Sequence, residues 1–168
     1  MKNFYLKQKV FSFRDRYKVY NENQEVVYHC EGRFFSITQR IDMIETKTGT
    51  HLYQLKRKLL TLLPAYRLYE AGGNQIASIK KRFRLFGHKI DIKSDYGHMV
   101  LEGNFSGYQF DATMDGKTAF EVRKKWFSWG DTYEVTIHME KHEALFLAMV
   151  IMIDNALHKS KKRSGGSH

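Results

Sequence analysis

The sequence predicts a closed barrel of twelve antiparallel strands around one buried C-terminal helix. The first observation behind this prediction is a β-rich unit that recurs about every 49 residues. Tyr17-Lys-Val-Tyr20 returns as Tyr66-Arg-Leu-Tyr69, and Ile41-Asp-Met43 returns as Ile90-Asp-Ile92. A third, looser copy begins at Leu101. The other two observations are the turn residues that divide each copy into short strands, and an apolar run near the C-terminus.

Each copy divides into four short strands separated by turn residues. Gly72-Gly73-Asn74 supplies the positive-φ positions of one hairpin, and Asp115-Gly116 forms the turn of another. Many short strands at a spacing of about 8–12 residues indicate a barrel or a sandwich. The expected strands are Leu6–Phe13, Tyr17–Tyr20, Val26–Glu31 and Ser36–Ile44 in the first copy, Leu52–Leu62, Tyr66–Glu70, Gln75–Lys81 and His88–Lys93 in the second, and Met99–Phe105, Tyr108–Thr113, Thr118–Arg123 and Thr132–His138 in the third.

The segment Ala144–Ile153 is apolar on every face, so we expect a helix that is buried all round and continues to about His158. This apolar run is too short to span a bilayer, which takes about 20 residues. A barrel of twelve strands, in turn, is too wide for its own side chains to fill. Both requirements are met if the helix runs through the barrel.

Length and composition fit a single folded domain. The chain has 168 residues, of which 42% are hydrophobic, and this is enough to bury a sizeable core. We expect the domain to span residues 1–158, and residues 159–168 to form a basic, disordered tail. The formal net charge is +10, and it remains positive without the tail cations. A basic body favours anionic partners, such as the phosphates of lipids or of nucleic acid.

The sequence also favours a cytoplasmic protein. Cys30 is the single cysteine, so no intrachain disulfide can form and a reducing compartment fits best. The residues that follow Met1 do not form the apolar core of a signal peptide. No apolar run approaches the length of a membrane span. Any membrane association is therefore expected to be peripheral.

Several segments resemble the LURP-one-related (LOR) family of the tubby C-terminal-like superfamily. The resemblance runs from about residue 4 to residue 158, and it implies a closed twelve-stranded barrel around a central C-terminal helix. It rests on Leu55-Lys-Arg-Lys-Leu-Leu-Thr-Leu62, Tyr66-x-x-Tyr69, Ile76–Lys81, Asp131–Ile137, Glu143–Leu145 and Ala148–Asp154.

The resemblance is weaker guidance to function. Tubby proteins bind phosphoinositides, and the similar phospholipid scramblases act at membranes, while many LURP-one-related proteins have no assigned activity. This sequence lacks the Pro-rich and Cys-rich N-terminal region of the scramblases, and their acidic cluster before the last helix is reduced to Asp131 and Glu134. Calcium binding needs several converging oxygen ligands. Calcium-dependent scrambling is therefore not expected.

Two equivalent hairpins are the best candidates for a binding site: Lys80–Phe86 in the second copy and Arg123–Trp129 in the third. Basic and aromatic residues alternate in both, as suits an anionic membrane surface where cations contact phosphates and rings lie at the headgroup level. If half of the cations face the surface, they contribute about 3–4 kcal/mol. In the alternative interpretation, rings such as Phe83 point into the barrel and the cations are merely solvated. The candidate residues are Lys80, Lys81, Arg82, Arg84, Arg123, Lys124, Lys125, Trp126 and Trp129.

Two other classes of function remain open. One is a structural or protein-interaction module with no lipid role, whose partner the sequence does not identify. The other is a binder of polyanions or nucleic acid, although no RNP, KH, zinc-finger or helix-turn-helix motif is present. No enzyme is expected, because the sequence lacks G-x-S-x-G, P-loop, H-E-x-x-H and C-x-x-C motifs. No cofactor is expected either.

The remaining titratable residues are interpreted as structural. His138 and His142 are separated by the junction between strand and helix, so no metal site is expected. Asp111 and Asp115 flank a hairpin turn. Cys30 is expected in the core. Asp154 ends an apolar helix, where its carboxylate must reach water or a cation, for example an arginine at the rim of the barrel.

Overall fold

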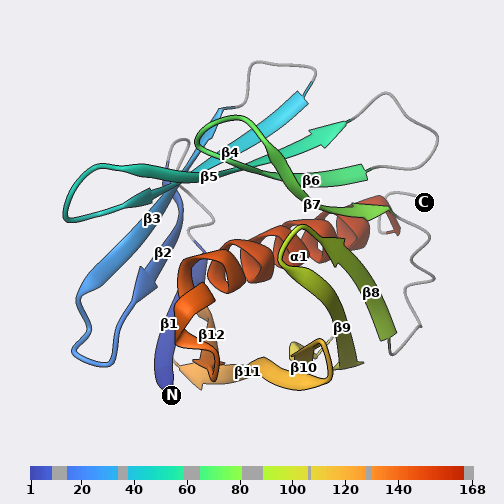
Figure 1. Cartoon of the computed structure of the whole chain (residues 1–168). Helices are drawn as coiled ribbons and strands as arrows, with labels where there is room; N and C mark the ends of the chain where they lie inside the picture. The colour runs from blue at the N-terminus through green and yellow to red at the C-terminus, as the bar shows by residue number, and fades with distance from the viewer. Residues whose placement is uncertain are drawn as a thin grey trace.

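The computed structural model describes residues 1–8, 15–33, 38–58, 65–80, 89–105, 107–127 and 130–164. These residues form twelve strands, a short 3-10 helix and one α-helix (Figure 1). The elements are β1 (Lys2–Gln8), β2 (Asp15–Tyr20), β3 (Val26–Arg33), β4 (Thr38–Glu45), β5 (His51–Lys58), β6 (Ala65–Glu70), β7 (Gln75–Lys80), β8 (Lys89–Ser94), β9 (Gly97–Asn104), β10 (Gln109–Met114), β11 (Lys117–Phe127), β12 (Gly130–Ile137), η1 (Glu140–His142) and α1 (Glu143–Ser164).

The strands form one closed antiparallel barrel. Each strand pairs with its neighbours in sequence, and β1 closes the barrel by pairing with β12 from Lys2↔Ile137 to Lys7↔Thr132. Closure leaves no free sheet edge between the first and last strands. The predicted fold class is confirmed, and each expected strand corresponds to an observed one.

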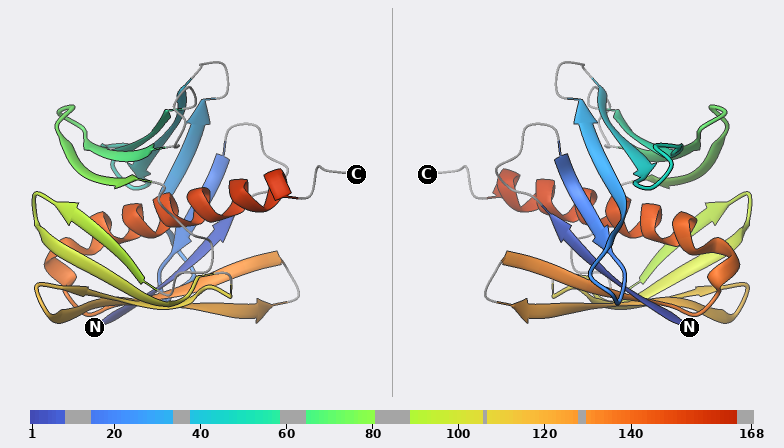
Figure 2. Two further views of the ribbon diagram at one scale, coloured as in Figure 1. Left: turned by 90° about the vertical axis from the view of Figure 1, so that its right-hand side faces the viewer. Right: turned by 90° about the vertical axis from the view of Figure 1, so that its left-hand side faces the viewer.

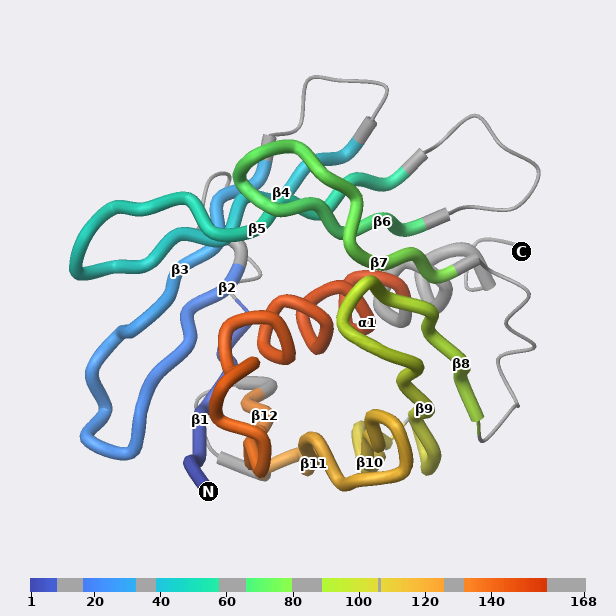
Figure 3. The backbone as a smooth tube through the Cα atoms, in the orientation of Figure 1, coloured from blue at the N-terminus to red at the C-terminus, as the bar shows by residue number. Residues whose placement is uncertain are grey.

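The barrel has two ends, because successive strands run in opposite directions. We name the first the turn end: it contains the connections 21–25, 46–50, 71–74, 95–96 and 115–116 and the segment 138–142 that leads into α1. We name the second the exit end: it contains Gln8 of β1, Asp15 of β2 and the corresponding ends of the other strands. The helix starts at the turn end and leaves the barrel at the exit end (Figures 2 and 3).

Local chemistry accounts for the tight turns of the turn end. Gly73 has φ +87°, while Asp115 and Gly116 have φ +49° and +79°. These values match the hairpin turns predicted from Gly-Gly-Asn and Asp-Gly, because tight turns need residues at positive φ. The carboxylate of Asp115 also accepts a hydrogen bond from the backbone N–H of His98 at 3.1 Å.

The helix fills the barrel. Every residue of α1 from Leu145 to Asn155 is at most 6% exposed, on all faces of the helix. Inward-facing strand residues surround it, and the ring of Phe120 packs against that of Phe146 with centroids 5.4 Å apart. The prediction that the apolar helix runs through the barrel is therefore confirmed. Among the described residues, no helix combines the length and the apolar character needed to cross a membrane.

The observed helix is longer than predicted. It continues to Ser164, whereas the apolar run predicts an end near His158 and a disordered tail after it. The physical reason is that Lys159, Lys161, Lys162 and Arg163 form helices readily, and their charges are favourable near the negative end of the helix dipole. Residues 165–168 lie outside the described residues.

Candidate functional site

The exit end carries an excess of basic residues. Among the last three residues of each strand at this end, Lys and Arg outnumber Asp and Glu, and the end of α1 adds four further cations. The basic strand residues are Lys7, Arg16, Arg33, Arg40, Lys56, Arg57, Lys58, Arg67, Lys80, Lys89 and Lys125, and the acidic ones are Asp15, Glu31, Asp91, Glu102, Asp111 and Asp131.

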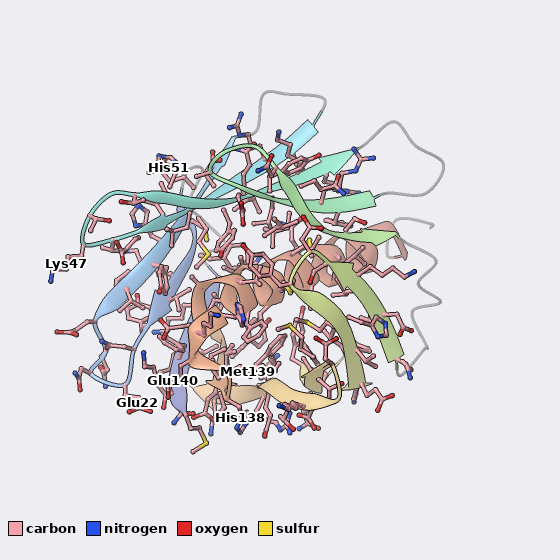
Figure 4. The ribbon with its side chains drawn as sticks, viewed as in Figure 1. Glu22, Lys47, His51, His138, Met139 and Glu140 are labelled. Carbon is pink, nitrogen blue, oxygen red and sulfur yellow. The ribbon has the colours of Figure 1, made fainter. Side chains whose placement is uncertain are left out.

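The turn end has the opposite balance. Counting its connections, the start of α1 and the last three residues of each strand, acidic residues outnumber basic ones. Figure 4 labels Glu22, Lys47 and Glu140 among its side chains. The acidic residues are Glu22, Glu25, Glu45, Glu70, Asp95, Asp115, Glu140 and Glu143, and the basic ones are Lys2, Lys18, Lys47, Lys93, Lys117 and Lys141.

The N-terminus neutralises part of the acidic charge at the turn end. The ammonium group of Met1 lies 2.5 Å from Glu140, and Lys2 Nζ lies 2.9 Å from Glu143. The hydrogen bond from the N-terminal ammonium holds the pKa of Glu140 below its usual value. The start of the chain is thereby attached to the start of the buried helix.

The basic candidate residues on β11 are only partly free to meet a ligand. Arg123 pairs with Asp111 at 2.6 Å and with Glu121 at 3.2 Å, and it donates a further hydrogen bond to the carbonyl of Phe110. Lys125 pairs with Glu134 at 2.6 Å. Both side chains are about 40% exposed, so these ion pairs are weak, but they reduce the positive charge available to a partner.

Strand alternation separates the three consecutive cations of β11. Lys124 lies opposite Tyr133 and follows the buried Val122 by two residues, so it shares the inner face of the strand with them. Arg123 and Lys125 lie on the outer face. Lys124 therefore does not share a surface with Arg123 and Lys125.

Two further candidate residues, Lys80 and Trp126, lie at the exit ends of their strands. Lys80 is the last residue of β7, and Trp126 lies opposite Asp131 in the pairing of β11 with β12. A Trp126 ring at the surface favours headgroup binding, and a ring in the barrel core favours the alternative interpretation. Its direction stays a prediction. Lys81, Arg82, Arg84 and Trp129 lie outside the described residues, as does Phe83.

A buried carboxylate lies between the helix and the barrel wall. Asp154 is only 2% exposed, and its Oδ2 accepts a hydrogen bond of 2.7 Å from the hydroxyl of Tyr17. Burial and this negative charge raise the pKa of Tyr17 well above its usual value. Burial raises the pKa of Tyr108 as well, with further contributions from Asp154 and Tyr133. An arginine at the rim is the expected partner of Asp154, and within the described residues its contacts include the hydroxyls of Tyr17 and Tyr108.

The tyrosines around Asp154 occupy repeated positions in the sequence. Tyr17 opens the tyrosine pair of the first copy, and Tyr108 belongs to the corresponding segment of the third. The ring of Tyr108 stacks on that of Tyr133 with centroids 4.3 Å apart. Sequence reasoning missed this cluster, although the recurrence of tyrosine at one repeat position was a usable signal. The cluster has no exposed nucleophile, and its contacts tie α1 to the barrel wall.

The remaining titratable residues are buried or contact neighbouring side chains, and Asp111 is the one whose role differs from the prediction. Cys30 is fully buried, and burial raises the pKa of its thiol, so the thiolate needed of a nucleophile is disfavoured. His138 lies 3.0 Å from Glu121, while the ring of His142 packs against Phe146. Asp111 pairs with Arg123 instead of serving the turn that Asp115 forms. No cluster of three metal-ligating side chains occurs in the described part of the chain.

Comparison with known proteins shows the family of the chain. The sequence model of the LURP-one-related family matches residues 2–154. The chain is similar to "Uncharacterized protein YxjI" of Bacillus subtilis (strain 168), with 29% identity over 164 residues that cover 98% of this chain and 99% of that relative. No solved structure gives a significant match. Because the family match spans nearly all of the barrel and most of the buried helix, the chain belongs to the LURP-one-related family.

Proposed function

We propose that this protein is a non-enzymatic cytoplasmic protein that binds anionic phospholipid or phosphoinositide headgroups peripherally through its exit end. The observation that carries the proposal is the separation of charge along the barrel axis, with a basic exit end and a more acidic turn end. Near an anionic membrane such a molecule is oriented with its basic end toward the surface. The cations of the helix end lie at the same end of the barrel.

The expected affinity is modest. Each Lys or Arg near an anionic surface contributes about 1 kcal/mol. Because Arg123 and Lys125 are already paired with carboxylates, we expect no more than about three or four effective cations, which corresponds to a dissociation constant of roughly 1–6 mM. Such binding is reversible, and it strengthens steeply with the density of anionic lipid.

A structural or protein-interaction module is the second candidate. The ion pairs of Arg123 and Lys125 favour it, because they show outer-face cations neutralised within the barrel wall itself. Nucleic acid is third, since a basic surface alone attracts any polyanion. A lipid-specific role requires that the protein bind anionic vesicles more strongly than it binds an equal concentration of inorganic polyphosphate.

Co-sedimentation with vesicles of phosphatidylcholine and increasing phosphatidylserine tests the proposal. The variant Lys58→Glu, Lys80→Glu, Lys89→Glu changes three exit-end positions. Its matched control is Lys47→Glu, Lys117→Glu, Lys141→Glu, which changes the net charge equally at the turn end. We expect the exit-end variant to lose at least tenfold in binding and the control to retain most of it. Equal losses in the two variants, or binding that persists in 1 M salt, would contradict the proposed orientation.

Trp126→Ala separates a membrane-facing ring from a core ring. An interfacial Trp gives a loss of vesicle binding with little change in melting temperature. A core Trp gives a loss of about 3–5 kcal/mol in the free energy of unfolding. The second result would assign this hairpin to the barrel core and leave the strand-end cations to carry the binding.

A further inference from the structure

The hairpin of β7 and β8 is paired over only a short stretch of its length. Within the described residues, the two strands are joined by Ala77↔Ser94 and Ser78↔Lys93 alone. Both strands nevertheless continue toward the exit end, β7 to Lys80 and β8 back to Lys89. Figures 1 and 2 show the two strands diverging in that direction. We name this divergent part of the hairpin, between Ile79–Lys80 and Lys89–Ile92, the β7–β8 seam.

The repeat shows what regular pairing would look like at this position. Subtracting 49 from the residue numbers of Ser78↔Lys93 gives His29↔Ile44, which is a pair of the equivalent hairpin β3–β4. That hairpin continues with Cys30↔Met43 and Glu31↔Asp42. Their equivalents in the second copy would be Ile79 with Ile92 and Lys80 with Asp91, and these are not paired.

The third copy follows the first. Its hairpin β11–β12 is paired through to Phe127↔Gly130 at the exit end. Two copies of the hairpin are therefore closed, and the second copy is splayed.

The strands that border the seam are held firmly on their other sides. β6 pairs with β7 as far as Ala65↔Lys80, and β9 pairs with β8 as far as Lys89↔Glu102. Ile79, Ile90 and Ile92 are buried in the core. The seam thus presents two ordered backbone edges that no strand in the described part of the chain pairs. Such edges accept an added strand.

The chemistry of the seam favours an extended peptide as its ligand. Unpaired backbone N–H and C=O groups are costly to cover with hydrocarbon, so a lipid acyl chain fits poorly. An extended peptide satisfies these groups at a strand spacing of about 4.8 Å on each side. Lys80 and Lys89 lie in the seam and Lys93 directly beside it, against the carboxylates of Asp91 and of Glu102, which pairs with Lys89 at 3.3 Å. The remaining excess of positive charge favours an acidic peptide.

We propose that the β7–β8 seam binds an extended acidic segment of a partner protein by β-strand addition. The proposal does not depend on headgroup binding, because it rests on open backbone edges and not on the charge of the whole exit end. In the first and third copies of the repeat, strand pairing closes the equivalent position, so the open seam is particular to the second copy.

A redox-controlled lock tests the proposal. In Lys80→Cys, Asp91→Cys, a disulfide would impose the closed pairing that Glu31↔Asp42 has in the first copy. The control Ser78→Cys, Lys93→Cys links a pair that already exists and leaves the seam open. The native thiol Cys30 is buried, so it does not compete. The probe is a fluorescein-labelled peptide of alternating Glu and Val, followed by fluorescence anisotropy in the absence of lipid.

We expect oxidation to weaken peptide binding at least tenfold in the Lys80/Asp91 variant and to leave the control unchanged. The same peptide with two valines replaced by proline should not bind, because proline cannot complete the ladder. Equal binding in the oxidised and reduced forms, or equal binding of the proline peptide, would overturn the proposal.

Hydrogen exchange of the wild-type protein provides a test that does not depend on forming the disulfide. Saturating peptide should slow exchange of the amides in β7 and β8 that border the seam and not those of β3 and β4. No change in β7 and β8 would overturn the proposal. Vesicle binding by the locked variant is measured in parallel, so a failure of the seam and a failure of headgroup binding are distinguishable.

Discussion

The two ends of the barrel differ in the contacts and in the net charge of their residues. At the turn end, charged groups contact one another, as Met1 does with Glu140, and the carboxylate of Asp115 accepts a hydrogen bond from the backbone N–H of His98 in the neighbouring hairpin. At the exit end, basic residues accumulate at the ends of the strands without a matching number of carboxylates. Some exit-end cations are paired as well, as Lys125 is with Glu134, but the exit end keeps a net positive charge and the turn end does not. The difference locates the candidate function at the exit end.

The helix connects the two ends, and its removal should have the largest effect. A chain that ends at Met139 loses the side chains that fill the barrel, including Phe146 and the buried carboxylate of Asp154. We expect no cooperative unfolding transition, since burial of α1 supplies much of the core. Near-ultraviolet circular dichroism and thermal melting check this. A truncated protein that still melts cooperatively would show that the barrel does not need its helix.

Glycines at the two ends should differ in their tolerance of a side chain. A Cβ on Gly103, near the exit end, would lie 2.4 Å from the carbonyl oxygen of Gln109 and 2.7 Å from Phe110 Cα, at φ +141°. At Gly116, in a turn, nothing lies within 4 Å and only φ +79° is unfavourable. Gly103→Ala should cost about 3–4 kcal/mol of unfolding free energy and Gly116→Ala about 1–2 kcal/mol. Urea denaturation measures both, and equal costs would contradict the backbone contact.

The Asp154 cluster should stabilise the exit half of the helix specifically. Asp154→Ala leaves the buried hydroxyl of Tyr17 without its acceptor, at a cost of about 2–3 kcal/mol in the free energy of unfolding. Tyr17→Phe should also destabilise the protein, because the buried carboxylate of Asp154 loses a hydrogen-bond donor. Hydrogen exchange should show the added opening in α1 beyond Ile153, with the first turns unchanged. Uniform loosening of the whole helix would mean that Asp154 does not act locally.

Alkaline pH should destabilise the protein through the same buried groups. Burial raises the folded-state pKa of Tyr17 above its usual 10.0 and that of Cys30 above its usual 9.0. Their contribution to stability is therefore complete below about pH 9, and it is lost as the pH rises, because the unfolded chain releases these protons first. Urea midpoints measured from pH 8 to pH 11 should fall, and less steeply in Tyr17→Phe. A midpoint that does not change over this range would show that these groups ionise equally well in the folded protein.

The smallest effect on stability is expected from surface charge. Lys58→Glu, Lys80→Glu, Lys89→Glu should change the free energy of unfolding by about 1 kcal/mol or less, because exposed ion pairs contribute little. The corresponding turn-end reversal should behave alike in thermal melting, although the two differ in vesicle binding. A large loss of stability in the exit-end variant alone would assign its cations to the fold and remove the main argument for a binding role.

Particular elements show how far sequence reasoning reached. The strands, the Gly73 and Asp115-Gly116 turns and the buried helix were predictable, because periodicity and turn chemistry are local properties. For β11, the prediction reached only as far as basic and aromatic residues lying close together along the strand. Which of Arg123, Lys124 and Lys125 faces outward depends on the parity of the strand, and their carboxylate partners come from neighbouring strands. Local patterns do not encode those contacts.

By itself, the sequence determined the architecture of this protein: three copies of a four-stranded unit, and one apolar helix that had to be enclosed. It did so because apolar residues must be buried at the period of the element that carries them. Only the tertiary structure decided that basic residues gather at one end of the barrel, that Tyr17 meets Asp154 across the core, and that the β7–β8 hairpin stays splayed where β3–β4 closes. These features arise from residues far apart in sequence, and barrel closure alone sets the distances between them.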